Sequence, residues 1–416
     1  MSRYSGILKT LGPGILFAGA AIGVSHLVQS TRAGASYGFS LLFLVLVTNL
    51  LKYPFFEYGH RYTAATGESL LEGYRKLGRW AIVTFLCLSL VTSFINVSAI
   101  TLVTAGLAEY LFQTGLNPVA ISTVLLTLIV ILLILGKYPL LDKLMKFMIV
   151  ILSITTIVAL VAAVRHGAAV QEGFVSPQIW TFSGIAFMLA LMGWMPAPIE
   201  VSVWQSLWAL ERKKQTRHHP TMKEALTDFY VGYGGAAVLA LVFLSLGALV
   251  MYGTGEEFAN SGVAFSAQLV QLYTKTLGEW SHVFISAAAL ITMFSTLITV
   301  LDAYPRVLRG SMILSFDGFR RWQNALYWIW VVILAVISII VILFFQHTLR
   351  SLIDLATIIA FLSAPGFAII NYIVITSPQI PEELRPPRWL KLISWVGMIY
   401  LVGFGLIYIG SRFWAA

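Results

Sequence analysis

Residues 12–38 read GPGILFAGAAIGVSHLVQSTRAGASYG, and this stretch decides the fold. It is apolar and long enough to cross a bilayer as a helix, which takes about 20 residues. Its middle nevertheless holds a glycine, Gly23, a histidine, His26, and an arginine, Arg32. Ionisable side chains are costly inside a membrane span and are found there mainly where they have a function. The stretch therefore predicts a membrane-spanning helix that is interrupted at a binding site.

The whole chain has the composition of an integral membrane protein. Of its 416 residues, 58% are hydrophobic and 11% are charged, and the mean hydropathy is +0.85. Backbone in contact with lipid must form its hydrogen bonds internally, so long apolar runs predict spanning helices rather than barrel strands. We count eleven such runs, at residues 11–36, 39–58, 80–112, 118–136, 142–164, 180–208, 227–252, 280–305, 324–346, 351–376 and 388–411.

The net charge of +9 reflects topology rather than a nucleic-acid partner. Basic residues gather in alternate connections, as at residues 75–79 and 212–217. The positive-inside rule places these connections in the cytoplasm. We therefore expect a multi-pass protein of the cell (inner) membrane, embedded in the lipid bilayer, with a cytoplasmic N-terminus and an external C-terminus.

A second break occurs in the sixth span, at GWMPAPIE. There Pro196 and Pro198 each lack a backbone N–H and cannot continue a regular helix. Spans 1 and 6 are five apart, and transporters built from inverted repeats have discontinuous helices at such matched positions. The sequence predicts one all-α transmembrane domain over residues 1–416, with repeats at about 11–164 and 180–376 and an additional span at 388–411.

The first span resembles that of NRAMP-type divalent-metal transporters. It opens with Gly-Pro-Gly and ends near an Ala-Gly-Ala, aromatic-Gly and Ser-Leu-Leu pattern, as in GASYGFSLL. The resemblance continues through ATGESLLEGY after span 2 and WMP in span 6, and it covers most of the chain. It implies the LeuT-type 5+5 inverted-repeat fold of that family, with about 11 transmembrane helices.

The metal-binding motif of the family is absent. Aligned from Gly-Pro-Gly, the family's Asp-Pro-Gly-Asn falls on residues 23–26, Gly-Val-Ser-His, so that Gly23 replaces the metal-binding aspartate. The family's Met-Pro-His in span 6 becomes Met195, Pro196 and Ala197, and SFINVSAITL in span 3 holds no acid. Divalent cations need oxygen or nitrogen ligands, preferably anionic ones for the harder metals. We therefore expect no metal site, and we expect the chain to belong to a divergent NRAMP-related branch that lacks the usual metal-binding motif.

The replacements favour an anion. Ser25, Gln29, Arg32 and Ser36 recur at spacings of four, three and four, which predicts one polar stripe on the second half of the span. Losing an aspartate and gaining an arginine makes the site more positive, and broken helices turn N–H groups toward the centre. The sequence predicts a secondary active transporter of a small inorganic anion. Bicarbonate is the leading candidate; nitrite, formate and acetate stay open. The predicted substrate-binding residues are Gly23, Ser25, His26, Gln29, Arg32, Met195, Ala197 and Glu200. Arg32 has a second interpretation, as the buried ion-pair partner of Glu200.

Uptake of a monoanion against an inside-negative potential needs a coupled ion. Protons suit bicarbonate poorly, because the two combine to CO2 and water, so sodium is the candidate coupling ion. Its predicted ligands are the hydroxyls of Ser295 and Thr296 and the backbone of Ala20, Ile22 and Gly23. Alternatively, these hydroxyls bond only their own helix backbone. We expect no other cofactor.

Two other functions are weighed against anion transport. A divalent-metal transporter of the NRAMP type, proton-coupled or uncoupled, would use His26, Met195, backbone carbonyls and Glu200. An enzyme would need a nucleophile with an orienting base or a phosphate-binding loop, and the sequence supplies neither. We therefore expect a transporter that is not an enzyme, and that works as a monomer.

Overall fold

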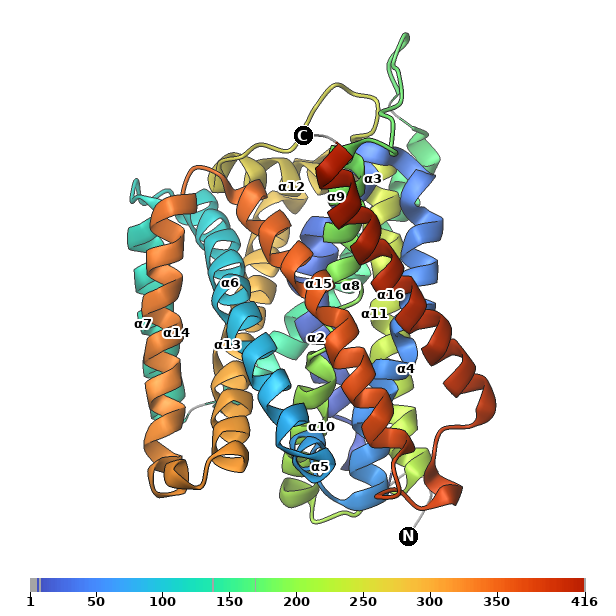
Figure 1. Cartoon of the computed structure of the whole chain (residues 1–416). Coiled ribbons are helices and arrows are strands. Elements are labelled where there is room, and N and C mark those ends of the chain that lie inside the picture. The colour runs from blue at the N-terminus through green and yellow to red at the C-terminus, as the bar shows by residue number, and fades with distance from the viewer. Residues whose placement is uncertain (1–5, 7–8, 137, 169, 415–416) are drawn as a thin grey trace.

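The computed structural model describes residues 6, 9–136, 138–168 and 170–414 of the chain. Helices are the only regular elements in these ranges, as predicted. Figure 1 shows them standing side by side in one bundle. We call the end of the bundle that carries α5 (Leu70–Leu77) the lower face, and the end that carries α12 (Gly262–Leu277) the upper face.

The eleven predicted spans are present. Eight helical stretches of the described residues are long and apolar enough to cross a membrane. The first of these joins spans 1 and 2, while span 5 and the first half of span 6 contribute shorter apolar helices, and the second half of span 6 is the more polar helix α10. The bounds are α2 (Pro13–Ala21), η1 (Ile22–Ser30), α3 (Thr31–Tyr37), η2 (Gly38–Leu41), α4 (Leu42–Thr66), α6 (Arg79–Phe112), α7 (Pro118–Leu135), α8 (Tyr138–His166), α9 (Phe182–Gly193), α10 (Val201–Thr216), α11 (Met222–Val250), η3 (Glu279–Ser281), α13 (His282–Ser315), η4 (Asp317–Trp322), α14 (Gln323–Phe345), α15 (Leu349–Thr376), η5 (Glu382–Leu384) and α16 (Arg388–Trp414).

Local sequence explains where several helices begin and turn. The Asn117 side chain accepts the N–H of Ala120, and Pro118 begins α7. Thr221 and Glu224 form a capping box at the start of α11. Spans 1 and 2 are separated at Gly38, whose φ of 56° and ψ of −136° suit glycine alone.

The helices extend beyond the apolar runs. Span 2 was expected to end at residue 58, but α4 continues to Thr66, and α13 continues to Ser315 rather than to residue 305. Hydropathy marks only the part of a helix inside the hydrocarbon, and helical hydrogen bonding continues past it. The helix α12 was not predicted, because it is amphipathic and lies at the upper face. The repeat boundaries stay a prediction.

Span 1 is fixed against α11 by glycines. A Cβ on Gly34 would lie 1.9 Å from the Leu244 carbonyl oxygen, and one on Gly247 would lie 2.2 Å from that of Thr31. Backbones approach this closely only where side chains are absent. The same helix holds the start of span 1, where a Cβ on Gly232 would lie 2.0 Å from the Gly14 carbonyl oxygen.

A buried carboxylate caps the first helix. Asp228 on α11 accepts the N–H groups of Gly12 at 2.9 Å and Gly14 at 2.7 Å. Its Oδ2 also lies 3.4 Å from Nε2 of His60 on α4. One side chain therefore joins spans 1, 2 and 7 near the lower face.

We expect Asp228→Ala to lower the free energy of unfolding by about 3 kcal/mol, because it leaves two N–H groups and His60 without their buried partner. Thermal melting in detergent measures the loss. Thr227→Ala on the same helix is the control, since that exposed hydroxyl bonds only the Lys223 carbonyl. Equal melting temperatures for both variants would contradict this role of Asp228.

Candidate functional site

The two predicted breaks are present, and they meet. In span 1, Gly23 leaves helical geometry, with φ of −57° and ψ of −124°, at the start of the π-helical segment η1. Span 6 is interrupted between Gly193 and Val201. The hydroxyl of Ser25 donates to the Pro196 carbonyl at 3.1 Å, which joins one break to the other.

A small cavity lies where the breaks meet. It measures about 40 Å³, enough for two or three water molecules or an ion of a few atoms. Spans 1, 3, 6 and 8 form its walls. The lining residues are Ala20, Val24, Ser25, Asn96, Ile100, Trp194, Ala197, Pro198, Val201, Trp204, Thr296, Val300 and Tyr304.

The polar groups of this cavity are neutral. The described residues that line it include no acid, lysine, arginine or histidine. Buried Nε1 groups of Trp194 and Trp204, and Oδ1 of Asn96, have no hydrogen-bond partner within the described part of the chain. Buried polar groups are normally hydrogen-bonded. Two indole donors and one amide oxygen on residues of the cavity wall are therefore unpaired in this structure.

Only part of the predicted substrate set lines the cavity. Ser25 and Ala197 do, whereas Gly23, His26, Gln29, Arg32, Met195 and Glu200 are not among the lining residues. Three residues of the predicted polar stripe, Ser25, Gln29 and Arg32, are all buried, and Arg32 donates to Gln29, but only Ser25 lines the cavity. The π-helical segment η1 ends at Ser30, between Gln29 and Arg32.

His26 is a packed residue that connects span 1 to span 7. The side chain is fully buried. Its Nδ1 lies 2.5 Å from the Ala21 carbonyl oxygen, and its Nε2 lies 2.7 Å from that of Ala236 on α11. Both ring nitrogens are thus engaged by backbone. This geometry favours a structural role over direct substrate binding.

Arg32 does form an ion pair, but the expected partner was wrong. Its Nη1 and Nη2 lie 2.8 and 3.2 Å from the two carboxylate oxygens of Asp354 on α15, not from Glu200. Nη1 also donates to Gln29 at 2.9 Å, and Gln29 donates to Thr357 at 3.2 Å. This network ties the second half of span 1 to span 10 on the upper side of the cavity.

Glu200 accepts hydrogen bonds from hydroxyls instead. Tyr304 donates to its Oε1 at 2.6 Å, and Thr92 and Ser89 of span 3 donate to its Oε2 at 2.8 and 3.3 Å. Tyr304 in turn accepts from Asn96 at 2.7 Å. Because Asn96 and Tyr304 line the cavity, the Glu200 carboxyl lies directly behind its wall.

The predicted sodium ligands are partly brought together. The backbone of Gly23 packs on Thr296 so closely that a Cβ there would lie 2.4 Å from the hydroxyl oxygen. Thr296 donates to the Thr292 carbonyl at 3.1 Å, and its side chain lines the cavity together with Ala20. Ile22 and Ser295 are buried but do not line it.

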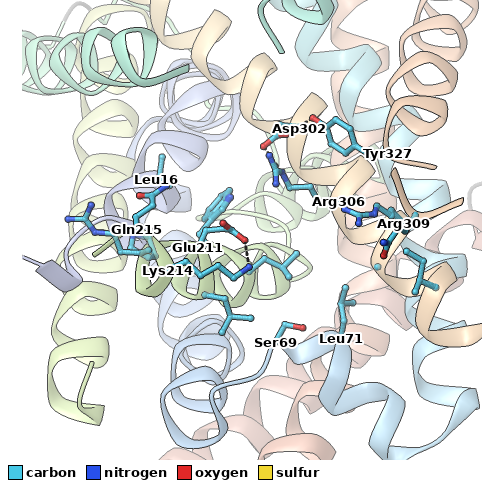
Figure 2. Close-up of a pocket in the computed structure, with 18 of the residues that line it drawn as sticks. Leu16, Ser69, Leu71, Glu211, Lys214, Gln215, Asp302, Arg306, Arg309 and Tyr327 are labelled. Carbon is cyan, nitrogen blue, oxygen red and sulfur yellow. Dashed lines mark hydrogen bonds and ion pairs between the residues drawn. The ribbon is translucent and has the colours of Figure 1, made fainter. Parts of the chain in front are cut away.

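A much larger pocket of about 1140 Å³ opens at the lower face, which we call the vestibule (Figure 2). Figure 2 shows the side chains of Lys214, Arg306 and Arg309 around it. The vestibule and the cavity follow one another along α2, α10 and α13. Trp204 lines the cavity and Trp208 lines the vestibule. The ring centroid of Trp204 lies 4.8 Å from that of Tyr304 and 6.1 Å from that of Trp208, so the two spaces are separated by packed aromatic rings.

Sequence reasoning missed one charged residue of the site. Lys52 in span 2 is completely buried, and its Nζ donates to the carbonyls of Met192, Gly193 and Ala197 at 3.1, 3.1 and 2.8 Å. A lysine inside the apolar run 39–58 was the available signal, because such residues are costly within a span.

The side chains offer no cluster of metal ligands. Within the described ranges, no group of three or more His, Cys, Asp or Glu residues could hold a metal ion. Met195 keeps the thioether of the family motif, but it is buried and is not among the residues that line the cavity.

Comparisons with known proteins identify relatives over the whole length. Residues 14–411 match the family described as natural resistance-associated macrophage protein-like. An uncharacterized protein of Pasteurella multocida (strain Pm70) is 36% identical over 414 residues, covering 99% of this chain and 94% of that protein. The divalent metal cation transporter MntH of Klebsiella pneumoniae (strain 342) is 24% identical over 418 residues, covering 97% and 94%.

Solved structures show the same fold. A variant of the Eremococcus coleocola manganese transporter has a TM-score of 0.74 at 15% identity, covering 99% of this chain and 88% of that one. MhsT in complex with L-phenylalanine has a TM-score of 0.63 at 14% identity, with 99% and 98% covered. The chain is thus a membrane transporter of the LeuT-type fold, and it belongs to the natural resistance-associated macrophage protein-like (Nramp) family.

Proposed function

We propose that this Nramp-family transporter carries a small inorganic anion, with bicarbonate as the first substrate to test, through the central cavity. One observation carries the proposal: the cavity at the two breaks offers hydrogen-bond donors, while its described lining contains no carboxylate. Oxyanions accept hydrogen bonds from N–H and O–H donors, and Trp194 and Trp204 of the cavity wall carry N–H groups without a partner among the described residues.

The same lining is unfavourable for a divalent metal. Thr296 and Ser25 offer neutral hydroxyls, and Asn96 offers one amide oxygen. Hard divalent cations take several oxygen ligands, usually including carboxylates, and softer ones take imidazole or thiolate. The one buried acid nearby, Glu200, is already bonded by three hydroxyls.

The size of the cavity supports an ion of a few atoms. About 40 Å³ excludes an amino acid or a nucleobase from this conformation. Bicarbonate, nitrite and formate share the planar arrangement of acceptor oxygens, and acetate adds one methyl group. Competition among these four anions would rank them directly.

Transport is proposed to run between the upper side and the vestibule. The lower face carries Arg75 and Lys76 at the end of α5 and Lys213 and Lys214 near the end of α10. By the positive-inside rule we assign this face to the cytoplasm and the protein to the cell (inner) membrane. Both breaks and the cavity belong to one chain, so a monomer has a complete site.

Sodium is the proposed coupling ion, at the contact between Gly23 and Thr296. The close approach of the broken backbone to a hydroxyl of span 8 supports this position. A sodium ion that enters with bicarbonate cancels the charge moved, and so removes an opposing term of about 2.3 kcal/mol per 100 mV.

The test is uptake into proteoliposomes that contain the purified protein. We expect saturable uptake of labelled bicarbonate that is faster with sodium than with choline outside, and no uptake of manganese above that of empty liposomes. Bicarbonate uptake equal to that of empty liposomes would contradict the proposal.

We expect Trp204→Phe to lower anion uptake about tenfold, because an aromatic ring is kept while one N–H donor to the substrate is lost. Phenylalanine is smaller than tryptophan at this buried position, so the melting temperature should fall modestly, and uptake is compared at a temperature where both proteins stay folded. Trp208→Phe in the vestibule is the matched control and should transport as the unmutated chain does. Unchanged uptake by Trp204→Phe would exclude its indole as a substrate ligand.

A divalent metal is the second candidate, favoured by the 24% identity to a divalent metal cation transporter. Met195 and the carbonyls of the two breaks would then be its ligands. Calorimetry with manganese distinguishes the two functions. Saturable one-to-one binding, together with manganese uptake and no bicarbonate uptake, would replace the anion by the metal.

A further inference from the structure

Lys52 binds the broken end of the first half of span 6. The last helical residue of α9 is Gly193, and the final turn of any helix leaves carbonyl groups without N–H partners. Beyond it, Pro196 and Pro198 have no N–H to offer. Lys52 reaches across from α4 and bonds the carbonyls of Met192, Gly193 and Ala197.

The number of acceptors indicates a charged ammonium group. Three carbonyl oxygens lie 2.8–3.1 Å from Nζ, and carbonyl oxygens can only accept. A neutral amine has two N–H donors, whereas an ammonium has three. The geometry therefore uses all the donors of a protonated lysine.

The polar partners of the Lys52 ammonium group are carbonyl oxygens. No carboxylate of the described residues pairs with Lys52, and the Phe56 ring centroid lies 5.9 Å from Nζ. The C-terminal end of α9 adds a partial negative charge, because the peptide dipoles of a helix add up along its axis. A monovalent cation in a carbonyl cage is held by the same kind of oxygens in channel filters.

The ammonium is adjacent to the cavity. Ala197 both accepts a hydrogen bond from Nζ at 2.8 Å and lines the cavity wall. A fixed positive charge behind one residue of the wall raises the potential inside a small cavity, whereas the Glu200 carboxyl behind another part of the wall is bonded by three hydroxyls. It favours an anion there and disfavours a cation.

We propose that Lys52 is a tethered cation: its ammonium group occupies the carbonyl cluster at the span 6 break, keeps free cations out of it, and determines that the adjacent cavity accepts anions. The part on selectivity rests on the proposed function. The occupation of the carbonyl cluster does not, so the two can be tested separately.

The test compares Lys52→Met with the unmutated protein by titration with potassium ions. Methionine fills the volume of the lysine stem up to Cε, and so leaves space only where the ammonium was. We expect Lys52→Met to bind potassium saturably and to melt higher in potassium than in choline, whereas the unmutated protein does neither. Bicarbonate uptake by this variant in potassium-free buffer should fall by about tenfold or more, because no cation then occupies the carbonyl cluster.

Two further variants separate charge from hydrogen bonding. Lys52→Gln keeps N–H donors for the carbonyls without the charge, and it should fold but lose anion uptake. Lys76→Met removes the charge of a half-exposed lysine on α5, which pairs with Glu68, and it should transport as the unmutated chain does.

Other outcomes for the Lys52 variants would overturn either the tethered cation or the proposed function. If Lys52→Met and Lys52→Gln fold, bind no potassium and carry bicarbonate normally, the assignment is overturned, as it is if neither variant folds in any salt. Normal uptake by Lys52→Gln alone would overturn it too, because the hydrogen bonds and not the charge would then matter. If the unmutated protein carries no anion while Lys52→Met binds potassium, the proposed function fails and the tethered cation stands.

Discussion

Gly23→Ala is expected to reduce transport by about a hundredfold, because small displacements at a binding site have effects of this size. The added Cβ would lie 2.4 Å from the Thr296 hydroxyl oxygen and 2.9 Å from its methyl carbon, so the span 1 break and span 8 must separate. Initial rates of labelled-bicarbonate uptake in proteoliposomes measure the loss.

Gly234→Ala and Gly235→Ala on α11 are matched controls, since a Cβ at either position meets nothing within 4 Å. Adding Thr296→Ala to Gly23→Ala then distinguishes packing from ion binding. Recovered transport in this double variant would mean that Thr296 only packs against the break. If the Thr296 hydroxyl is a ligand of the coupling ion, we expect the double variant to fold but not to transport bicarbonate at any sodium concentration. Full activity of Gly23→Ala alone would contradict the close contact.

Arg32→Gln is expected to open the upper side of the cavity. The variant removes the paired hydrogen bonds between Arg32 and Asp354 that join span 1 to span 10. Folding should survive, because the Asp354 side chain is 34% exposed and water can solvate its carboxylate, so the cost is about 1 kcal/mol. We expect an impermeant thiol reagent outside the cell to label a cavity cysteine about tenfold faster than in the unmutated background.

The reporter is Ala197→Cys in a chain whose only other cysteine, the exposed Cys87, is changed to serine. Asp354→Asn should have the same effect as Arg32→Gln. Arg306→Gln is the control, because it breaks an arginine–aspartate pair of the vestibule, with Asp302, rather than of the upper side. Labelling rates that do not change in either upper-side variant would show that the pair does not close the cavity.

The fold could be predicted because its signals are local. An apolar run long enough to span a bilayer and a pair of prolines in span 6 are visible in the sequence, and both breaks lie where the pattern placed them. Helix ends were less predictable, since hydropathy reports the hydrocarbon and not the hydrogen-bonded length. The π-helical winding of η1 left no signal in the residue pattern.

The site could be predicted only in part, because its partners are distant in sequence. Arg32 had an obvious acid at Glu200, but Asp354 is 322 residues away, and only the tertiary fold brings the two side chains together. Glu200 instead accepts hydrogen bonds from Ser89 and Thr92 of span 3, and nothing in the sequence distinguishes these two residues from other serines and threonines of membrane helices. Lys52 was visible as a charge within a span, yet no pattern links it to the carbonyls of span 6.

The glycine contacts between span 1 and α11 restrict how the molecule can move. Both halves of span 1 touch α11 backbone to backbone, at Gly14 with Gly232 and at Gly34 with Leu244. Contacts without intervening side chains cannot slide by repacking rotamers, so a displacement of either half must carry α11 with it. We therefore expect spans 1 and 7 to move together during alternating access, and to slide against α8 and α13, the neighbouring helices on which they pack.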